Sequence, residues 1–307
     1  MKIFIKSPNE NWILDRITKE WRTLKPDYCT DSLDNADLIW IISPWQWRQI
    51  PPNLLLDKKV LMTVHHIVPE KFTAAALQEF LIRDKFIDKY HTPCQKTKDF
   101  ISKLTNKPVE VIGYWYNSGI WQPANKVEAR EKLQIPPEAY VVGSFQRDTE
   151  GSDLISPKLE KGPDLFIESL KKIDKNNLLV LLGGWRRQYV IKRLKEEGIN
   201  FRFIEMAPIE TLKDMYACCD LYIVASRVEG GPQAILEASA MKIPIISRDV
   251  GMATAVLSEN CVIDVPENIY FPVNSDVEFC YNNVKKYEMK NLVEHYLEFF
   301  KKTFKEK

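Results

Sequence analysis

Residues 225–238 read Ala-Ser-Arg-Val-Glu-Gly-Gly-Pro-Gln-Ala-Ile-Leu-Glu-Ala. The apolar run 221–225 before the glycines is typical of a buried strand, and residues 233–240 after the proline are typical of a helix. A strand, a glycine loop and a helix N-terminus present backbone N–H groups and the positive end of a helix dipole to an anion. Glu229 lies in this loop, and Glu237 would lie in the second turn of the helix. The stretch therefore predicts an anion-binding loop with two carboxylates beside it.

These residues resemble the donor-binding signature of the retaining glycosyltransferases of family 4 (glycosyl transferases group 1), which have the GT-B fold. The family pattern has Ser, two residues, Glu-Gly, two residues, three apolar positions and Leu-Glu-Ala, and it closes with a Gly-x-Pro-Val-Val strand and a small Asp/Gly loop. The closing part here reads Lys-Ile-Pro-Ile-Ile-Ser-Arg-Asp-Val-Gly at 242–251. Gly231-Pro232 replaces the usual Phe-Gly, and Ile243 replaces the glycine before the proline. Neither departure removes a side chain with a chemical role.

The resemblance implies an α/β protein of two Rossmann-like, doubly wound parallel-sheet domains that face a central cleft, with the C-terminal helix crossing back to the first domain. A chain of 307 residues is long for one core and comfortable for two. The expected acceptor-side domain is 1–118 together with helix 290–307, and the expected donor-binding domain is 119–289. The boundary follows the stretch 109–123, which resembles the crossing segment of the family.

Composition excludes several classes of function. Hydrophobic residues make up 45% and charged residues 28%, as in an ordinary globular protein, and the net charge of +1 gives no electrostatic reason to bind nucleic acid. The six cysteines form neither a C-x-x-C pair nor a zinc-type cluster with histidine, so a reducing, cytoplasmic location is expected. We find no signal peptide, and no apolar run approaches the roughly 18 residues that span a bilayer.

Strands and helices alternate in the first half of the sequence, which predicts a parallel sheet covered by helices. We expect strands at 2–6, 36–42, 59–64, 86–91 and 109–112, and helices at 12–24 and 71–83. Ligands of such sheets bind beyond the carboxyl ends of the strands. Residues 7–11, 43–47 and the pair His65-His66 should therefore face one cleft.

The segment Thr63-Val64-His65-His66 resembles the Thr-x-His-Asp strand end of the family. His65 falls on the family's histidine, which lies beside the transferred sugar, and His66 replaces the aspartate. The alternative is that both histidines bond carbonyls of nearby loops. Trp45 and Trp47 suit the C–H faces of a sugar, although one of them would equally anchor its loop in the core.

Two basic residues of the second half are candidates for holding a diphosphate. Arg147 ends the predicted strand 140–147, and Lys161 follows an irregular polar stretch, 148–160. They match the diphosphate-binding pair of the family, with a longer spacer than usual. Two fixed cations would stabilise the oxygens of a departing nucleoside diphosphate.

The rest of the second half continues the strand and helix alternation. We expect strands at 178–182, 201–205 and 261–265, and helices at 126–133, 189–197, 209–219 and 292–305. Arg130 and Lys132 are expected to be exposed, and Arg186 and Arg187 to lie on a solvated face rather than on a phosphate. Met206 lies where the family holds the nucleobase through backbone groups.

The resemblance implies a retaining, hexosyltransferase-type enzyme that moves a sugar from a nucleoside diphosphate sugar to an acceptor hydroxyl without a metal. Glu237 would bond the ribose and Glu229 the donor sugar, while His65 orients that sugar. Gly230, Gly231 and Gln233 would offer backbone N–H groups. Since the leaving phosphate helps to deprotonate the acceptor in this family, we name no protein nucleophile.

The expected donor is a UDP-sugar, with a GDP-sugar as the alternative, and no other cofactor is implied. Expected acceptors are a glycan, a lipid-linked glycan or another hydroxyl compound. Lysines 301, 302, 305 and 307 suggest weak peripheral contact with the inner membrane face, but a solvated helix face explains them better.

Two other classes of function stay open. A nucleotide-sugar-processing enzyme of the same fold, such as an epimerase or a synthase, would consume donor without an added acceptor. A non-catalytic nucleotide-sugar-binding protein would bind without turnover, although Arg147, Glu229 and Glu237 together argue against it. A dinucleotide-dependent dehydrogenase is poorly supported, because no G-x-G-x-x-G follows the first strand.

Overall fold

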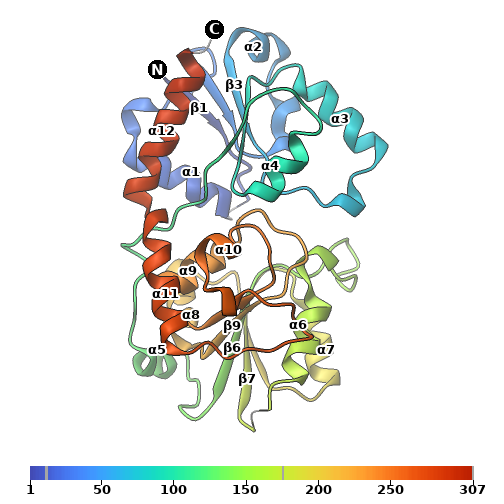
Figure 1. Cartoon of the computed structure of the whole chain (residues 1–307), viewed down its shortest axis with the longest axis vertical. Helices are drawn as coiled ribbons and strands as arrows, with labels where there is room; N and C mark the ends of the chain where they lie inside the picture. The colour runs from blue at the N-terminus through green and yellow to red at the C-terminus, as the bar shows by residue number, and fades with distance from the viewer. Residues whose placement is uncertain (11–12, 175, 306–307) are drawn as a thin grey trace. The chain divides into compact units, whose positions relative to one another are not determined.

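The structure is a computed structural model that describes residues 1–10, 13–174 and 176–305. Over these ranges the chain forms two compact units (Figure 1). The first contains Met1–Trp115 and the segment from Met289, and the second contains Tyr116–Glu288. Predictions that named Asn11, Trp12 and Lys307 lie outside the described residues.

The first unit is built on a parallel sheet with strands in the order β1-β2-β3-β4-β5. The strands are β1 (Ile3–Lys6), β2 (Leu38–Ile41), β3 (Lys59–Thr63), β4 (Lys89–Thr92) and β5 (Val109–Val111). An isolated parallel bridge joins Ile3 to Cys29, and the N–H of Thr30 donates to the carbonyl of Ile3. The carbonyl of Lys2 instead accepts from Leu38 of β2, so the bridge lies on the opposite edge of β1. The chain therefore leaves β1 in one direction and returns to build the sheet in the other, which makes the unit doubly wound.

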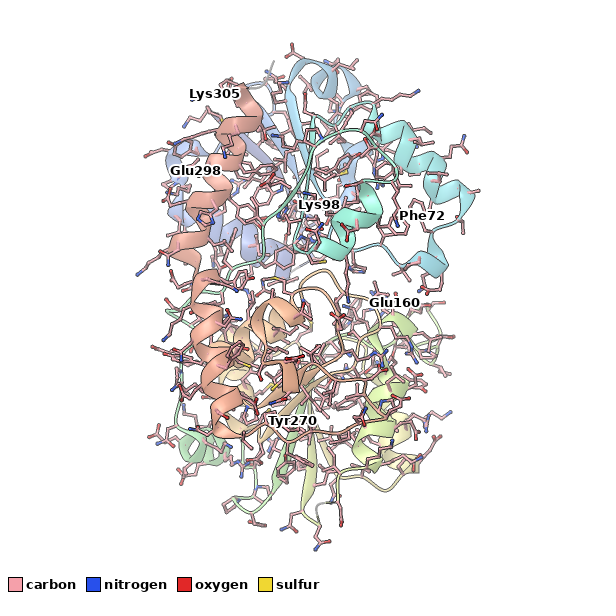
Figure 2. The ribbon with its side chains drawn as sticks, in the orientation of Figure 1. Phe72, Lys98, Glu160, Tyr270, Glu298 and Lys305 are labelled. Carbon is pink, nitrogen blue, oxygen red and sulfur yellow. The ribbon has the colours of Figure 1, made fainter. Side chains whose placement is uncertain are left out.

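Alternation along β2 gives this sheet two apolar faces. Ile39 and Ile41 pack with Phe80 of α3 (Ala74–Asp84) and with residues of α2 (Pro52–Asp57) and α4 (Gln95–Ile101). On the other face, Trp40 packs on Trp21 of α1 (Ile13–Leu24) and on Tyr296 and Phe300 of α12 (Met289–Lys305), as the placement of the helices in Figure 1 allows. Glu298 and Lys305, labelled in Figure 2, lie on the exposed side of α12.

The sheet of the second unit has the order β10-β9-β6-β7-β8. Its strands are β6 (Tyr140–Phe145), β7 (Leu178–Gly184), β8 (Phe201–Glu205), β9 (Leu221–Val224) and β10 (Ile245–Ser247). Its helices are α5 (Lys126–Lys132), α6 (Pro163–Lys171), α7 (Gln188–Glu196), α8 (Ile209–Cys218), α9 (Gln233–Ala240), α10 (Ala253–Val256) and α11 (Asn274–Val284). The strand order reverses between β6 and β9, and ligands of doubly wound sheets bind at the carboxyl ends of the strands at such a switch point.

The structure corrects three predictions. Residues 261–265 do not form a strand: a 3-10 turn, Glu259–Cys261, leads to an isolated bridge between Val262 and Ser247, because β10 is short and offers little edge to pair with. Arg130 is buried, because its guanidinium reaches Asp220 at 2.7 Å and the carbonyl of Cys218. Arg187 is also buried rather than solvated, as described below.

The described residues contain no helix that combines the length and the apolar character needed to cross a membrane.

Candidate functional site

The loop after β9 is tied to the segment that enters α6. The N–H groups of Arg227 and Val228 donate to the carbonyl of Glu160, at 2.8 and 3.1 Å; Glu160 is labelled in Figure 2. Gly162 has a φ of +62°, and a Cβ added there would lie 1.9 Å from the carbonyl oxygen of Ala225. Only glycine fits such a backbone approach. The sequence Lys-Gly thus fixes Lys161 beside the loop at the switch point.

Lys161 and Glu229 form an ion pair at this edge of the sheet. The Nζ of Lys161 lies 2.5 Å from Oε1 of Glu229, and the hydroxyl of Ser226 donates to the same oxygen at 3.0 Å. The side chains of Glu229 and Lys161 are 9% and 20% exposed, so water screens the pair only in part. A phosphate could replace Glu229 as the partner of Lys161, and a sugar hydroxyl could replace Lys161 as the partner of Glu229.

Arg147 follows the end of β6 and is held from two sides. Its Nε donates to the carbonyl of Thr149 at 2.9 Å, and its guanidinium carbon lies 5.1 Å from the ring centre of Trp185. Lys158 lies nearby: burial, and then the positive charge of Lys161 and Arg147, lower the pKa of Lys158, against the opposing effect of Glu160. Sequence reasoning missed Lys158, which no motif marks. Positive charge therefore gathers at this edge of the sheet.

The helix that follows the loop begins at Gln233, with Pro232 at the capping position. Gly230 and Gly231 precede it, and Gly251 packs so closely that an added Cβ would lie 2.5 Å from the carbonyl oxygen of Gly230. These contacts hold the backbone of the loop at the N-terminus of α9, where the positive end of the helix dipole favours an anion.

Glu237 lies in the second turn of α9 and is 4% exposed. Its Oε2 accepts a hydrogen bond of 2.9 Å from the hydroxyl of Tyr216, on α8. Burial, and then the charge of Glu237, raise the pKa of Tyr216 well above its usual value, so this tyrosine stays a donor. This partner was not predicted from the sequence, because Tyr216 and Glu237 are 21 positions apart and no local pattern links them.

Met206 follows β8 in a backbone conformation that favours glycine, with a φ of +44°. Its N–H donates to the carbonyl of Gly184 at the end of β7, and its side chain is 41% exposed. The backbone at Met206 therefore has a conformation that glycine adopts more readily than methionine does.

In the first unit, His65 uses both ring nitrogens. Nε2 lies 2.6 Å from the carbonyl oxygen of Ile42, and Nδ1 pairs with the hydroxyl of Tyr114. Burial lowers the pKa of His65 to about 3. The ring is therefore neutral, with Nε2–H donating to Ile42 and Nδ1 accepting from Tyr114. A donor sugar would have to exchange with one of these partners.

The loops after β1, β2 and β3 lie together, as expected for parallel strands. The amide of Gln46 donates to the carbonyl of Ser7 at 2.9 Å, and His65 reaches the end of β2. Trp47 is buried and donates to Glu79, while Trp45 is 56% exposed. Trp47 thus anchors its loop, and Trp45 stays available for a ligand.

An open groove of about 530 Å³ lies beside β1 and is lined by Ser7, Asn9, Asp15, Lys19, Arg22 and Asp31 among others.

Asp148 and Arg187 form a fully buried ion pair behind Arg147. The distance from Nε of Arg187 to Oδ2 of Asp148 is 2.5 Å, and both side chains are 0% exposed. No local pattern predicts this pair, because each residue lies in a polar stretch typical of surface loops. Across the described ranges, His, Cys, Asp and Glu side chains form no group that could hold a metal ion.

Comparisons with known proteins agree with this architecture. Residues 156–269 match the family model "Glycosyl transferases group 1". The chain is similar to a D-inositol 3-phosphate glycosyltransferase of Streptosporangium roseum, with 27% identity over 57% of this chain and 42% of the relative. It is also similar to the lipopolysaccharide core biosynthesis mannosyltransferase LpsB of Rhizobium meliloti, with 24% identity over 65% of this chain and 56% of the relative. The chain thus spans about half the length of these curated relatives.

Solved structures show the same fold over nearly the whole chain. HepE of Anabaena, crystallised with UDP, superposes with a TM-score of 0.76 at 14% identity, covering 98% of this chain and 100% of that one. Sucrose-phosphate synthase of Thermosynechococcus elongatus gives 0.66 at 16% identity, over 95% and 78% of the two chains.

The parallel sheets of both units, together with these neighbours, define a protein of the GT-B fold. Within the second unit, residues 156–269 are similar to the glycosyl transferases group 1. The fold expected from the sequence is confirmed.

Proposed function

We propose that the protein is a glycosyltransferase that moves a sugar from a nucleoside diphosphate sugar to an acceptor hydroxyl. The observation that carries the proposal is the cluster at the switch point of the second unit. There the ion pair Lys161–Glu229 lies at the loop that leads into α9, and Arg147 follows Gln146, whose amide donates to the carbonyl of Lys161 at 3.1 Å. Cations and backbone N–H groups bind a diphosphate, and a carboxylate accepts from sugar hydroxyls.

A UDP-sugar is the proposed donor, with a GDP-sugar as the alternative. HepE was crystallised with UDP-glucose as well as with UDP, and it has the same fold as this chain. We propose that main-chain groups around Met206 hold the base, as the family resemblance implies. Glu237 is the proposed partner of the ribose, oriented by Tyr216.

The proposed chemistry follows from the charges at the site. As the bond between sugar and diphosphate breaks, negative charge grows on the leaving oxygens, and Arg147 and Lys161 stabilise it. We propose that, when the donor binds, Lys161 shifts part of its interaction from Glu229 to the phosphate, so that Glu229 can accept from a hydroxyl of the sugar before the bond breaks. We further propose that the reaction retains the anomeric configuration and needs no metal ion, with His65 orienting the sugar.

The acceptor is proposed to be a glycan or a lipid-linked glycan. LpsB is named for lipopolysaccharide core biosynthesis, which supports a glycan acceptor. The groove beside β1 and the exposed ring of Trp45 are the features of the first unit that suit it. We also propose a cytoplasmic location. The exposed lysines of α12 would allow only weak contact with the inner membrane face, and a solvated helix face explains them better.

Calorimetric titration with UDP, GDP, ADP and CMP tests the donor site first. We expect one diphosphate to bind to the wild type, and Glu237→Ala to weaken that binding. Release of the same diphosphate from its sugar conjugates is then measured with and without acceptor glycans, in buffer with and without EDTA. Product NMR reports the anomeric configuration. Binding of none of these nucleotides would contradict the proposal.

A further inference from the structure

The buried pair Asp148–Arg187 makes contacts that lead to Arg147. Arg187 enters α7 from the loop after β7, and Asp148 follows Arg147 directly after β6. Arg187 also donates to the carbonyl of Gly183 at 2.7 Å, to the hydroxyl of Ser144 at 3.1 Å and to the carbonyl of Ser144. The guanidinium thus joins the carboxyl ends of β6 and β7.

Asp148 in turn forms hydrogen bonds with Thr149, which holds Arg147, and with Lys158. Its second carboxylate oxygen accepts from the hydroxyl of Thr149 at 2.9 Å, and its carbonyl accepts from the N–H of Lys158 at 2.7 Å. The carbonyl of Thr149 in turn accepts from Nε of Arg147. Hydrogen bonds and adjacent peptide units therefore connect Arg187 to Arg147 without a break.

The same arginine fixes the other support of Arg147. Trp185, whose ring lies under the Arg147 guanidinium, is two residues before Arg187. Gly184, the last residue of β7, directly precedes Trp185. It has a φ of +98°, and a Cβ added there would lie 2.5 Å from the carbonyl oxygen of Gln146. The loop after β7 is therefore packed on the backbone next to Arg147, and its position depends on the buried pair.

The guanidinium of Arg147 is held in a way that leaves its terminal nitrogens for a ligand. Among the described residues, Nε is the nitrogen of Arg147 for which a hydrogen bond is seen. A buried ion pair contributes little net stability compared with well-packed apolar residues, because removing two charges from water costs about as much as their attraction returns. The main contribution of the Asp148–Arg187 pair is therefore to hold the ends of β6 and β7 in place rather than to stabilise the fold.

We infer that Asp148 and Arg187 are positioning residues that hold Arg147 in the orientation needed to bind the diphosphate of the donor. This inference rests on the proposed function, because it assigns Arg147 to the diphosphate. It predicts that the pair acts on ligands that carry phosphates and leaves the binding of the nucleoside unchanged.

The test uses the full chain and a variant in which both charges of the pair are removed, Asp148→Asn with Arg187→Gln. Removing Arg187 alone would leave a buried carboxylate unpaired and endanger the fold. Affinities for UDP and for uridine are measured by calorimetry. We expect UDP to bind about tenfold more weakly or worse, the loss of one charge-assisted hydrogen bond, and uridine to bind within about twofold of the wild type.

A double-mutant cycle with Arg147→Ala identifies the route. If the pair acts through Arg147, its replacement in the Arg147→Ala background should leave UDP affinity unchanged within about twofold. The conservative variant Arg187→Lys should restore part of the affinity, because it keeps the charge but lacks the fork of donors.

A matched control is the pair Arg130–Asp220, an Arg–Asp pair of the same unit at 2.7 Å, next to the amino end of β9. Arg130→Gln with Asp220→Asn should lower stability and leave UDP affinity unchanged. Unchanged UDP affinity in the Asp148/Arg187 variant, an equal loss for uridine, or additive losses in the cycle would each overturn the inference. If the wild type binds uridine but not UDP, the proposed diphosphate site itself is wrong and the inference fails with it.

Discussion

At the scale of single residues, Arg147 tests the proposed chemistry most directly. Its guanidinium is held by Thr149 and Trp185 at the edge of the sheet where the diphosphate is proposed to bind. We expect Arg147→Ala to lower kcat by on the order of a hundredfold or more, because the charge that stabilises the leaving group is lost. The measurement is release of nucleoside diphosphate from the sugar donor in the presence of acceptor.

The control for this prediction is Lys192→Ala, since Lys192 is an exposed base on α7 of the same unit. Its turnover should match that of the wild type. Turnover of Arg147→Ala close to the wild-type value would remove Arg147 from the proposed mechanism.

A second prediction at this scale concerns pH. His91 bonds Thr63, the carbonyl of Ile112 and Tyr296 inside the first unit, and burial lowers its pKa from 6.5 to about 4. In the unfolded chain His91 therefore becomes protonated below pH 6.5, whereas in the folded protein it stays neutral down to about pH 4. The stability that His91 contributes is present above pH 6.5 and is lost as the pH falls, by about 2 kcal/mol between pH 7 and pH 5.

Urea unfolding at pH 7 and pH 5 measures this effect. The difference in unfolding free energy between the two pH values should shrink in His91→Gln by about 2 kcal/mol. The variant His295→Gln, at an exposed position of α12, should keep the wild-type difference. Equal pH dependence in His91→Gln and the wild type would contradict the prediction.

At the scale of elements, the junction between β9 and α6 depends on Gly162. Alanine at this position meets both the left-handed backbone and the carbonyl oxygen of Ala225. We expect Gly162→Ala to cost more than the roughly 1–2 kcal/mol of backbone strain alone, and to lower activity because Lys161 is displaced from Glu229. Thermal unfolding and turnover are the two measurements.

Gly198 provides a matched comparison, because its φ is +67° and nothing lies within 4 Å of an added Cβ. Gly198→Ala should show the strain cost alone and keep full activity. If the two alanine variants lose equal stability, close packing on Ala225 does not restrain Gly162.

At the scale of the whole molecule, the chain's last helix completes the core of the first unit. Phe300 of α12 is fully buried, with its ring 5.0 Å from the rings of both Trp21 and Trp40. Phe300→Ala should lower the unfolding free energy by about 3–5 kcal/mol. Phe304, four residues later on the same helix, is 42% exposed, and Phe304→Ala should change stability by less than about 0.5 kcal/mol. Similar losses in both variants would mean that the aromatic cluster contributes no special stability.

The sequence by itself determined the parallel sheets, the order of their strands along the chain and the place of the glycine loop. These features follow from apolar runs of strand length and from glycines at turns, which are local properties of the chain. The helix predicted at 233–240 is α9. The strand predicted at 261–265 is wrong because β10, with 3 residues, offers this segment little edge to pair with.

The tertiary structure alone decided how the charged and polar side chains are paired. Arg187 and Asp148 are 39 positions apart in the sequence and meet beyond the carboxyl ends of β6 and β7. Tyr216 and Glu237 are 21 positions apart and meet between α8 and α9. Whether a charge is buried depends on which neighbours other strands and helices bring to it, and no local pattern carries that information. Arg130 and Arg187 were expected to be exposed to solvent. Both are buried instead, because a carboxylate from a distant segment pairs with each guanidinium.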